Sequence, residues 1–137
     1  MRLYLDTSAI IYSVEGIRET REAALGWIQK AEMGGLIVTS HLSRLECRVR
    51  PLRDRNDVLL ARYDALFTGR GLDLRPIDIE IIDRATEIRA RHGFKTPDAI
   101  HIATAVAAAC DVFLTGDIAL TRYQELKVEV VGSPTAG

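Results

Sequence analysis

Four acidic residues occupy positions from which their carboxylates can act together: Asp6, Glu46, Asp98 and Asp117. Asp6 directly follows the short apolar run Leu3–Leu5, and Asp117 comes shortly after a second such run, Val112–Leu114. Like charges that gather closely cannot all stay ionised unaided. Divalent cations remove this conflict, and a ligand set made only of oxygen atoms selects hard ions such as Mg²⁺ or Mn²⁺.

Carboxylates that hold a pair of such ions are typical of enzymes that hydrolyse phosphodiester bonds. In such a site one ion generates hydroxide from water, and the other stabilises the leaving oxygen. The four acids are therefore candidate catalytic residues and candidate metal ligands, provided that the fold brings them together.

Each acid also has an ordinary structural explanation when it is considered alone. Asp6 can cap the helix that follows it, and Asp117 can cap a short helix after a Gly-Asp turn. Asp98 follows a Thr-Pro pair and so lies in the first turn of a helix, where acids are common. Glu46 can pack its stem at the border of a helix while its carboxylate stays in water, because an unpaired buried charge is costly. Only the joint placement of the four favours a catalytic site.

The elements that must position these acids alternate between strand and helix. Short β-type runs occur at Leu3–Leu5, Leu36–Thr39, Leu72–Arg75, Val112–Leu114 and Val128–Val131. Segments with helical spacing of apolar residues separate these runs. Such alternation predicts right-handed βαβ units and a parallel sheet that helices cover on both faces. Ligands of such sheets bind beyond the carboxyl ends of the strands, where the strand order reverses.

A strand order of 3-2-1-4-5 would bring the four acids to one edge of the sheet. The first and fourth strands flank the reversal in that order, so Asp6 and Asp117 would lie close together. Asp98 opens the helix that enters the fourth strand, and Glu46 lies one turn into the helix that leaves the second. The sequence therefore predicts an α/β fold with a five-stranded parallel sheet and an acidic site at this edge.

Two predicted helices carry acids of this site. An apolar stripe at helical spacing surrounds Glu46: Leu42, Leu45, Val49 and Leu52. Glu46 borders the face that this stripe would bury, and Pro51 is predicted to break or restart the helix. The helix after Asp98 is apolar nearly all round over Ala99–Ala109, so it is predicted to be the most buried.

The composition is that of a globular domain of ordinary size. The chain has 137 residues, of which 47% are hydrophobic and 27% charged, so a disordered chain is excluded and a single domain is expected. No apolar run approaches the ~18 residues of a membrane span, and the first residues lack the apolar stretch of a signal peptide. We therefore expect a cytoplasmic protein with no membrane partner. Cys47 and Cys110 are not spaced as metal ligands and are expected in the core.

Four motifs carry a family resemblance: Tyr4-Leu-Asp-Thr-Ser8, Ser43-Arg-Leu-Glu46, Thr96-Pro-Asp-Ala-Ile-His-Ile-Ala-Thr-Ala105 and Phe113-Leu-Thr-Gly-Asp117. In their order and separations they resemble the PIN domain and, more narrowly, the VapC-type toxins of bacterial toxin–antitoxin pairs. The likeness extends from Leu3 to about Val131. It implies a three-layer α/β/α sandwich over residues 1–131, with residues 132–137 as a loose C-terminal tail.

The resemblance also implies an activity, a cofactor and partners. Such proteins are Mg²⁺-dependent ribonucleases whose first and third acids, here Asp6 and Asp98, are the firmest metal ligands, and Mn²⁺ is an alternative ion. Glu46 and Asp117 would complete the set. Many relatives carry Asn where this chain has Gly116. The family further implies a homodimer that a small cognate antitoxin inhibits.

Two residues near the acids are candidates for supporting roles. Thr115 can hydrogen-bond a neighbouring carboxylate or simply end its strand. His101 lies three residues after Asp98 on about the same side of the helix, so it can contact the site or lie in the core. We assign it no catalytic role from the sequence.

Basic residues are unevenly distributed although the net charge is −1. Of the 18 basic residues 15 are Arg, and seven of these lie between positions 41 and 70. Arg44, Arg48 and Arg53 are predicted to contact RNA phosphates, because an acidic pocket alone repels a polyanion. The alternative is a solvated face partly paired with Asp54 and Asp57.

Two other functions share parts of this pattern. A phosphatase of the haloacid dehalogenase kind uses an acid after its first strand as a nucleophile, but it needs a second Asp where this chain has Ser8. A non-catalytic receiver-like signalling module needs paired acids near the first strand and a Lys after the last. Here Lys127 precedes the final strand. Both alternatives are therefore less well supported than a metal-dependent ribonuclease.

Overall fold

The computed structural model describes residues 1–132, and its five strands form one parallel sheet in the order β3-β2-β1-β4-β5. The strands are β1 (Arg2–Leu5), β2 (Leu36–Ser40), β3 (Leu72–Arg75), β4 (Val112–Thr115) and β5 (Lys127–Val130). In the register, Leu3 of β1 lies opposite Ile37 of β2 on one side and Val112 of β4 on the other. The predicted order is confirmed, and β1 and β4 flank the reversal.

Helices connect the strands over the described residues. They are α1 (Thr7–Glu15), α2 (Arg18–Glu32), α3 (His41–Arg53), α4 (Asp57–Thr68), α5 (Ile79–His92), α6 (Thr96–Ala107) and the 3₁₀ helix η1 (Ile118–Arg122). None of these helices is long and apolar enough to cross a membrane. All but one residue of the predicted tail, residues 132–137, lies outside the described range.

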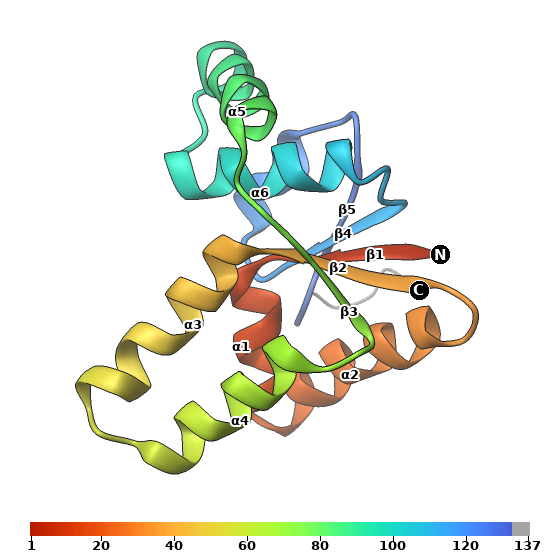
Figure 1. Ribbon diagram of the computed structural model, residues 1–137. Helices are drawn as coiled ribbons and strands as arrows, with labels where there is room; N and C mark the ends of the chain where they lie inside the picture. Colours follow the sequence, from red (N-terminus) through yellow and green to blue (C-terminus); the bar gives the residue numbers. More distant parts are fainter. Residues whose placement is uncertain (133–137) are drawn as a thin grey trace.

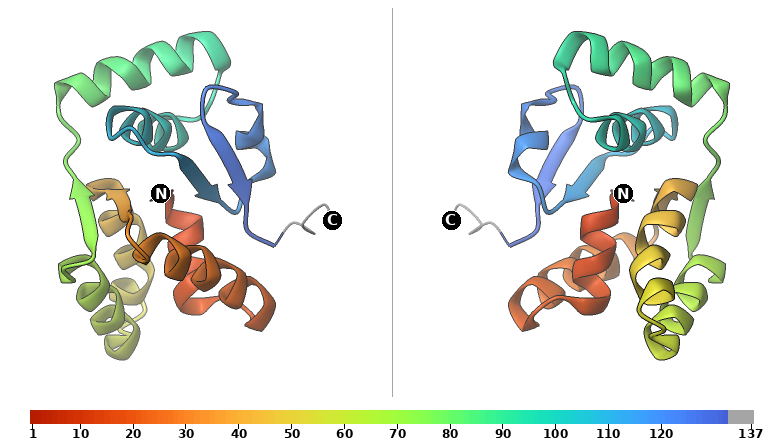
Figure 2. Two further views of the ribbon diagram at one scale, coloured as in Figure 1. Left: turned by 90° about the vertical axis from the view of Figure 1, so that its right-hand side faces the viewer. Right: turned by 90° about the vertical axis from the view of Figure 1, so that its left-hand side faces the viewer.

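The molecule is a three-layer α/β/α sandwich, with the sheet between two groups of helices (Figures 1 and 2). α5 and α6 lie over one face, where Tyr4 and Phe113 join a buried cluster with Ile102 of α6. Leu3 and Leu5 point to the opposite face and join a second cluster with α1, α2 and α4. Successive residues of β1 therefore alternate between the two layers, as the period of a strand requires.

The buried face of α3 differs from the predicted one. The buried residues of this helix are Ser43, Cys47 and Pro51. Leu45, Val49 and Leu52, which were predicted to be buried, are 59%, 51% and 63% exposed. The prediction was wrong because α3 packs against its neighbours through small side chains, with Ser43 hydrogen-bonded to Thr39 and Thr7.

The predicted break at Pro51 is also wrong, because α3 continues to Arg53. Pro51 lies in the last turn, where the loss of one backbone donor interrupts little of the helix. The backbone N–H of Asp54 still donates to the carbonyl of Arg50 and closes the turn. Two other predictions on burial are confirmed: Cys47 and Cys110 are buried and free, and α6 carries more buried residues than the other helices described.

Candidate active site at the carboxyl edge of the sheet

Asp6 is the first residue after β1, and it caps α1. Its Oδ1 accepts hydrogen bonds from the backbone N–H of Ala9 at 2.9 Å and from Ser8 Oγ at 2.6 Å. Its Oδ2 accepts one from Thr115 Oγ1 at 2.5 Å. The residue is 5% exposed. Three donors on three different residues hold the carboxylate in one orientation.

The same hydroxyl groups bind the loop that follows β4. The backbone N–H of Gly116 donates to Ser8 Oγ at 2.8 Å, and that of Asp117 donates to Thr115 Oγ1 at 3.0 Å. Asp117 in turn caps η1 by accepting from the N–H of Ala119 at 2.9 Å. The two strand ends at the reversal are therefore joined by hydrogen bonds, and both carry an aspartate.

Asp98 approaches this edge from the first turn of α6. Partial burial raises the pKa of its carboxyl, and the negative charges of Asp117 and Asp6 raise it further. His101 and Lys95 act in the opposite direction but do not cancel the shift. Asp117 and Asp6 therefore lie near enough to Asp98 to repel its charge.

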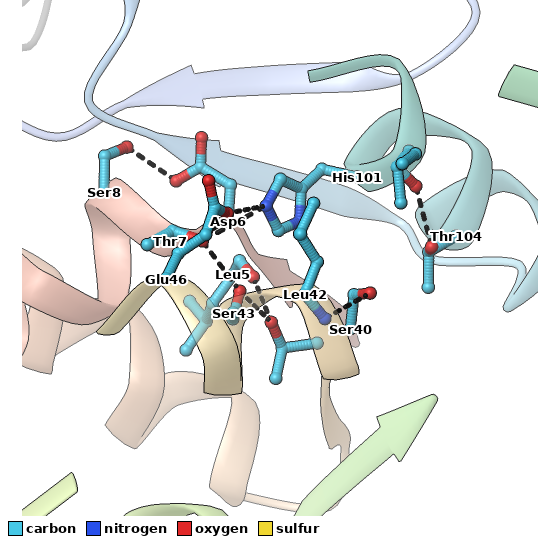
Figure 3. Close-up of polar contacts among 12 residues, drawn as sticks. Leu5, Asp6, Thr7, Ser8, Ser40, Leu42, Ser43, Glu46, His101 and Thr104 are labelled. Atoms are coloured by element: carbon cyan, nitrogen blue, oxygen red, sulfur yellow. Dashed lines mark hydrogen bonds and ion pairs between the residues drawn. The ribbon is translucent and has the colours of Figure 1, made fainter. Parts of the chain in front are cut away.

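Glu46 of α3 faces α1 and α6 (Figure 3). Its Oε1 accepts hydrogen bonds from Thr7 Oγ1 at 2.7 Å and from His101 Nε2 at 3.1 Å. Burial acts to raise the pKa of Glu46, but the hydrogen bonds from His101 and Thr7 outweigh it and hold the pKa below its usual value. Glu46 is thus kept ionised by one residue next to Asp6 and one residue of the helix that carries Asp98.

The fold corresponds to a known domain. A family model of the PIN domain matches residues 3–126. The chain belongs to the PIN domain family. No curated protein matches its sequence.

Solved structures share this PIN fold at low sequence identity. VapBC2 of Rickettsia felis, bound to a DNA fragment from its promoter, is 14% identical with a TM-score of 0.77 over 95% of this chain and 98% of the other. A toxin–antitoxin complex of Klebsiella pneumoniae is 19% identical, with a TM-score of 0.74 over 93% and 96%. VapC20 of Mycobacterium tuberculosis, a toxin that cleaves the sarcin–ricin loop, is 15% identical, with a TM-score of 0.66 over 81% and 86%.

The acids of this PIN domain fit a divalent cation in their chemistry. Nucleases with this domain generally depend on such metals. Asp6, Asp98 and Asp117 offer only oxygen donors, and their mutual repulsion is what a hard cation would relieve. Within residues 1–132, however, no three Asp, Glu, His or Cys side chains are close enough together to form a ligand set. That all four acids bind the metal ion, directly or through water, stays a prediction.

The absence of a side chain at Gly116 has a local explanation. A Cβ at this position would collide with the ring of Tyr12 and would lie 3.2 Å from Ser8 Oγ. In this PIN domain the Tyr12 ring therefore occupies the space that a side chain at position 116 would need.

The three predicted RNA-binding arginines lie on α3. Arg48 Nε is 2.7 Å from Asp64 Oδ1 and joins α3 to α4, and Arg53 Nε is 3.0 Å from Asp54 Oδ1 at the exposed end of the helix. Arg44 lines a shallow groove between α3 and α4, together with Arg48. Contact of these residues with RNA stays a prediction.

Three residues of the site were not selected from the sequence. Thr7 and Ser8 hydrogen-bond Glu46 and Asp6, although two hydroxyl residues after a strand-end acid are also an ordinary helix start. Tyr4 OH lies 2.7 Å from His101 Nδ1. Side chains alternate between the two faces of β1, which puts Tyr4 on the face that α6 covers. Which residue of α6 it contacts depends on how that helix packs on the sheet, and the sequence pattern does not specify this.

Proposed function

We propose that this PIN domain is a Mg²⁺- or Mn²⁺-dependent endoribonuclease. The observation that supports the proposal is the repulsion of Asp98 by Asp117 and Asp6, the two aspartates that follow the strands on either side of the reversal. When bound, a divalent ion supplies charge neutralisation and activates water for attack on a phosphodiester. Asp6 and Asp98 would be its principal ligands, with Asp117 and Glu46 completing the site directly or through water.

The residues around the acids have separate tasks in this proposal. Ser8 and Thr115 hold Asp6 in one orientation through the hydrogen bonds at Oδ1 and Oδ2. Thr7 keeps Glu46 in place beside them. Arg44, Arg48 and Arg53 would attract the RNA backbone and offset the repulsion of the acidic edge.

We further propose that the protein is the toxin of a type II toxin–antitoxin pair, acting in the cytoplasm as a homodimer that a cognate antitoxin inhibits. The support is that its structural neighbours include chains of toxin–antitoxin complexes, and the match extends over nearly the whole length of those chains. A short antitoxin gene beside the coding sequence, and a stable complex on co-expression, are the expected observations.

The structure speaks against the receiver-like alternative. Receiver modules have the strand order 2-1-3-4-5, whereas this sheet has the order β3-β2-β1-β4-β5. Ser8 counts against the phosphatase alternative. That chemistry needs a second carboxylate at this position, whereas Ser8 carries a hydroxyl that donates to Asp6 Oδ1.

The proposal is tested by incubating the purified protein with RNA in EDTA and then with Mg²⁺ or Mn²⁺. We expect no cleavage in EDTA and recovery with either metal. The products should carry 5′-phosphate and 3′-hydroxyl ends, because water rather than the 2′-hydroxyl attacks phosphorus. Cleavage in EDTA, or 2′,3′-cyclic phosphate ends, would exclude the proposed mechanism.

A further inference from the structure

His101 joins three elements of the site through its two ring nitrogens. The residue is 2% exposed. Its Nδ1 lies 2.7 Å from Tyr4 OH of β1, and its Nε2 lies 3.1 Å from Glu46 Oε1 of α3 and 3.2 Å from Thr7 Oγ1 of α1 (Figure 3). Both nitrogens therefore have partners in the site.

The partners determine which ring nitrogen carries the proton. An ionised carboxylate only accepts hydrogen bonds, so His101 Nε2 must donate to Glu46. Burial raises the pKa of Tyr4 well above its ordinary value, so its hydroxyl keeps its proton. His101 Nδ1 lies within hydrogen-bond distance of that hydroxyl and can accept a hydrogen bond from it, and the side chains of Thr39 and Thr104 are further hydrogen-bonding neighbours of the Tyr4 oxygen. A ring that carries a proton on Nε2 and offers the lone pair of Nδ1 satisfies both contacts at once.

Tyr4 is a rigid support for this ring. It is fully buried, lies opposite Phe113 in the register of β1 and β4, and stacks on that ring at a centroid distance of 5.1 Å and an interplanar angle of 11°. A donor fixed in the middle of the sheet therefore sets the orientation of His101.

The hydrogen bonds at Glu46 leave one of its oxygens available. Thr7 and His101 both donate to Oε1. Within residues 1–132, Oε2 accepts no hydrogen bond, and the side chain is 29% exposed. The carboxylate is thus held by one oxygen and presents the other.

We propose that His101 is a positioning residue of the active site: Tyr4 holds its ring with the proton on Nε2, and Nε2–H holds Glu46 Oε1 so that Oε2 faces the reacting groups. The inference rests on the proposed function for the part that Glu46 takes in cleavage. The alternative is a buried histidine that only fills the core.

The first test is ¹⁵N NMR of the histidine rings at pH 7 without metal, with the signal of His101 assigned by H101Q. We expect a protonated Nε2 and an unprotonated Nδ1. Y4F should abolish this fixed preference and keep the stacked ring. The matched control Y123F, which removes the hydroxyl of another buried tyrosine, should leave the preference unchanged. A ring protonated at Nδ1, alone or together with Nε2, would overturn the inference. This test needs no nuclease activity.

The second test is single-turnover RNA cleavage by H101Q and H101L. Glutamine keeps an N–H donor near the position of Nε2, and leucine keeps only the bulk. H101L should slow cleavage about tenfold or more with little change in RNA affinity, and H101Q should recover most of the rate. Equal losses in the two variants would overturn the inference. Y4F supplies the same kinetic comparison, against Y123F, if H101L does not fold.

A double-mutant cycle separates action through Glu46 from action elsewhere. In an E46Q background, H101L should cause no further loss of rate, because the group that His101 positions is already gone. Losses that multiply would contradict a role through Glu46. If the wild type cleaves no RNA, the proposed function fails, and the NMR result still decides whether Tyr4 fixes His101.

Discussion

The strand side and the helix side of this site hold their aspartates in opposite ways. Asp6, after β1, is buried and accepts three hydrogen bonds. Asp98, on α6, accepts none in the part of the chain that the structure describes, and burial together with the charges of Asp117 and Asp6 raises its pKa. Hydrogen bonds therefore hold Asp6 in place without a metal ion, whereas Asp98 is repelled by its neighbours, and a cation would relieve this repulsion.

The difference follows from where the two acids stand in the fold. Asp6 lies at the reversal of the sheet, where the hydroxyls of Ser8 and Thr115 reach it from α1 and β4. Asp98 lies in the first turn of a helix, whose dipole stabilises an acid by about 0.3–1 kcal/mol. β1 therefore supplies the geometry of the site, and α6 supplies its excess negative charge.

The largest expected effect is on cleavage. D6N and D98N should each lower the rate of Mg²⁺-supported RNA cleavage at least about 100-fold, because each removes a charged oxygen ligand. D83N makes the same change on the exposed surface of α5 and should leave the rate unchanged. Initial rates under identical conditions check this, and a D98N protein that still cuts RNA would make Asp98 an ordinary helix-start residue.

Stability in EDTA should separate the two acids. D6N should destabilise the fold by about 1–2 kcal/mol, because it removes charge-assisted hydrogen bonds and puts an NH2 group, which cannot accept from Thr115, in the place of Oδ2. D98N should be as stable as the wild type or more stable by at most about 1 kcal/mol, since solvent screens this half-buried charge. Thermal melts measure both changes. If D98N melts as low as D6N, the contrast between the two sides disappears.

The repulsion at Asp98 should also appear in the pH dependence of stability. A raised pKa means that the folded state binds this proton more tightly than the unfolded state. The resulting stability is fully present below the ordinary value of 3.8 and is lost as the pH rises through the folded-state pKa.

D98N removes this titration. Its advantage in unfolding free energy over the wild type should therefore grow as the pH rises through the raised pKa and level off above it. Urea denaturation of both proteins in EDTA across acidic pH values measures the difference. A difference independent of pH would show that Asp98 is not under repulsion in the folded state.

The smallest expected effect concerns the arginines of α3. R48A and R53A should weaken RNA binding for all sequences and reduce the salt slope of affinity by about 1 for each phosphate that the variant no longer neutralises. R18A, which breaks a pair with Glu22 on α2, is the matched control. An unchanged slope would leave Arg48 and Arg53 as surface residues that serve only their pairs with Asp64 and Asp54.

The positions of three of the acids in the fold were predictable, because the alternation of strands and helices determines where each strand ends and each helix begins. Asp6 and Asp117 follow apolar runs that are strands one and four, and the order 3-2-1-4-5 places them on both sides of the reversal. Asp98 was placed by the helix-start signal before an almost wholly apolar helix. Each inference depends on local pattern and one topological rule.

What the sequence left open depends on contacts between distant elements. The hydrogen bond between Tyr4 and His101 joins residues 97 positions apart in the sequence, and the hydrogen bond between Asp6 and Thr115 joins residues 109 positions apart. Their existence depends on register and layer spacing, which periodicity does not specify. The buried face of α3 was predicted wrongly for a related reason. Leu45 belongs to an apolar stripe at helical spacing, but the smaller Ser43 is the residue that packs against β2.

The most direct test of the account is whether a divalent ion stabilises the folded protein through Asp98. Binding to the folded state alone should raise stability by about 2.7 kcal/mol at a Mg²⁺ concentration 100 times the Kd. Thermal melts with EDTA or with Mg²⁺ should show this rise for the wild type and for D83N, and a much smaller one for D98N. A D98N protein that gains as much from Mg²⁺ as the wild type would contradict the account.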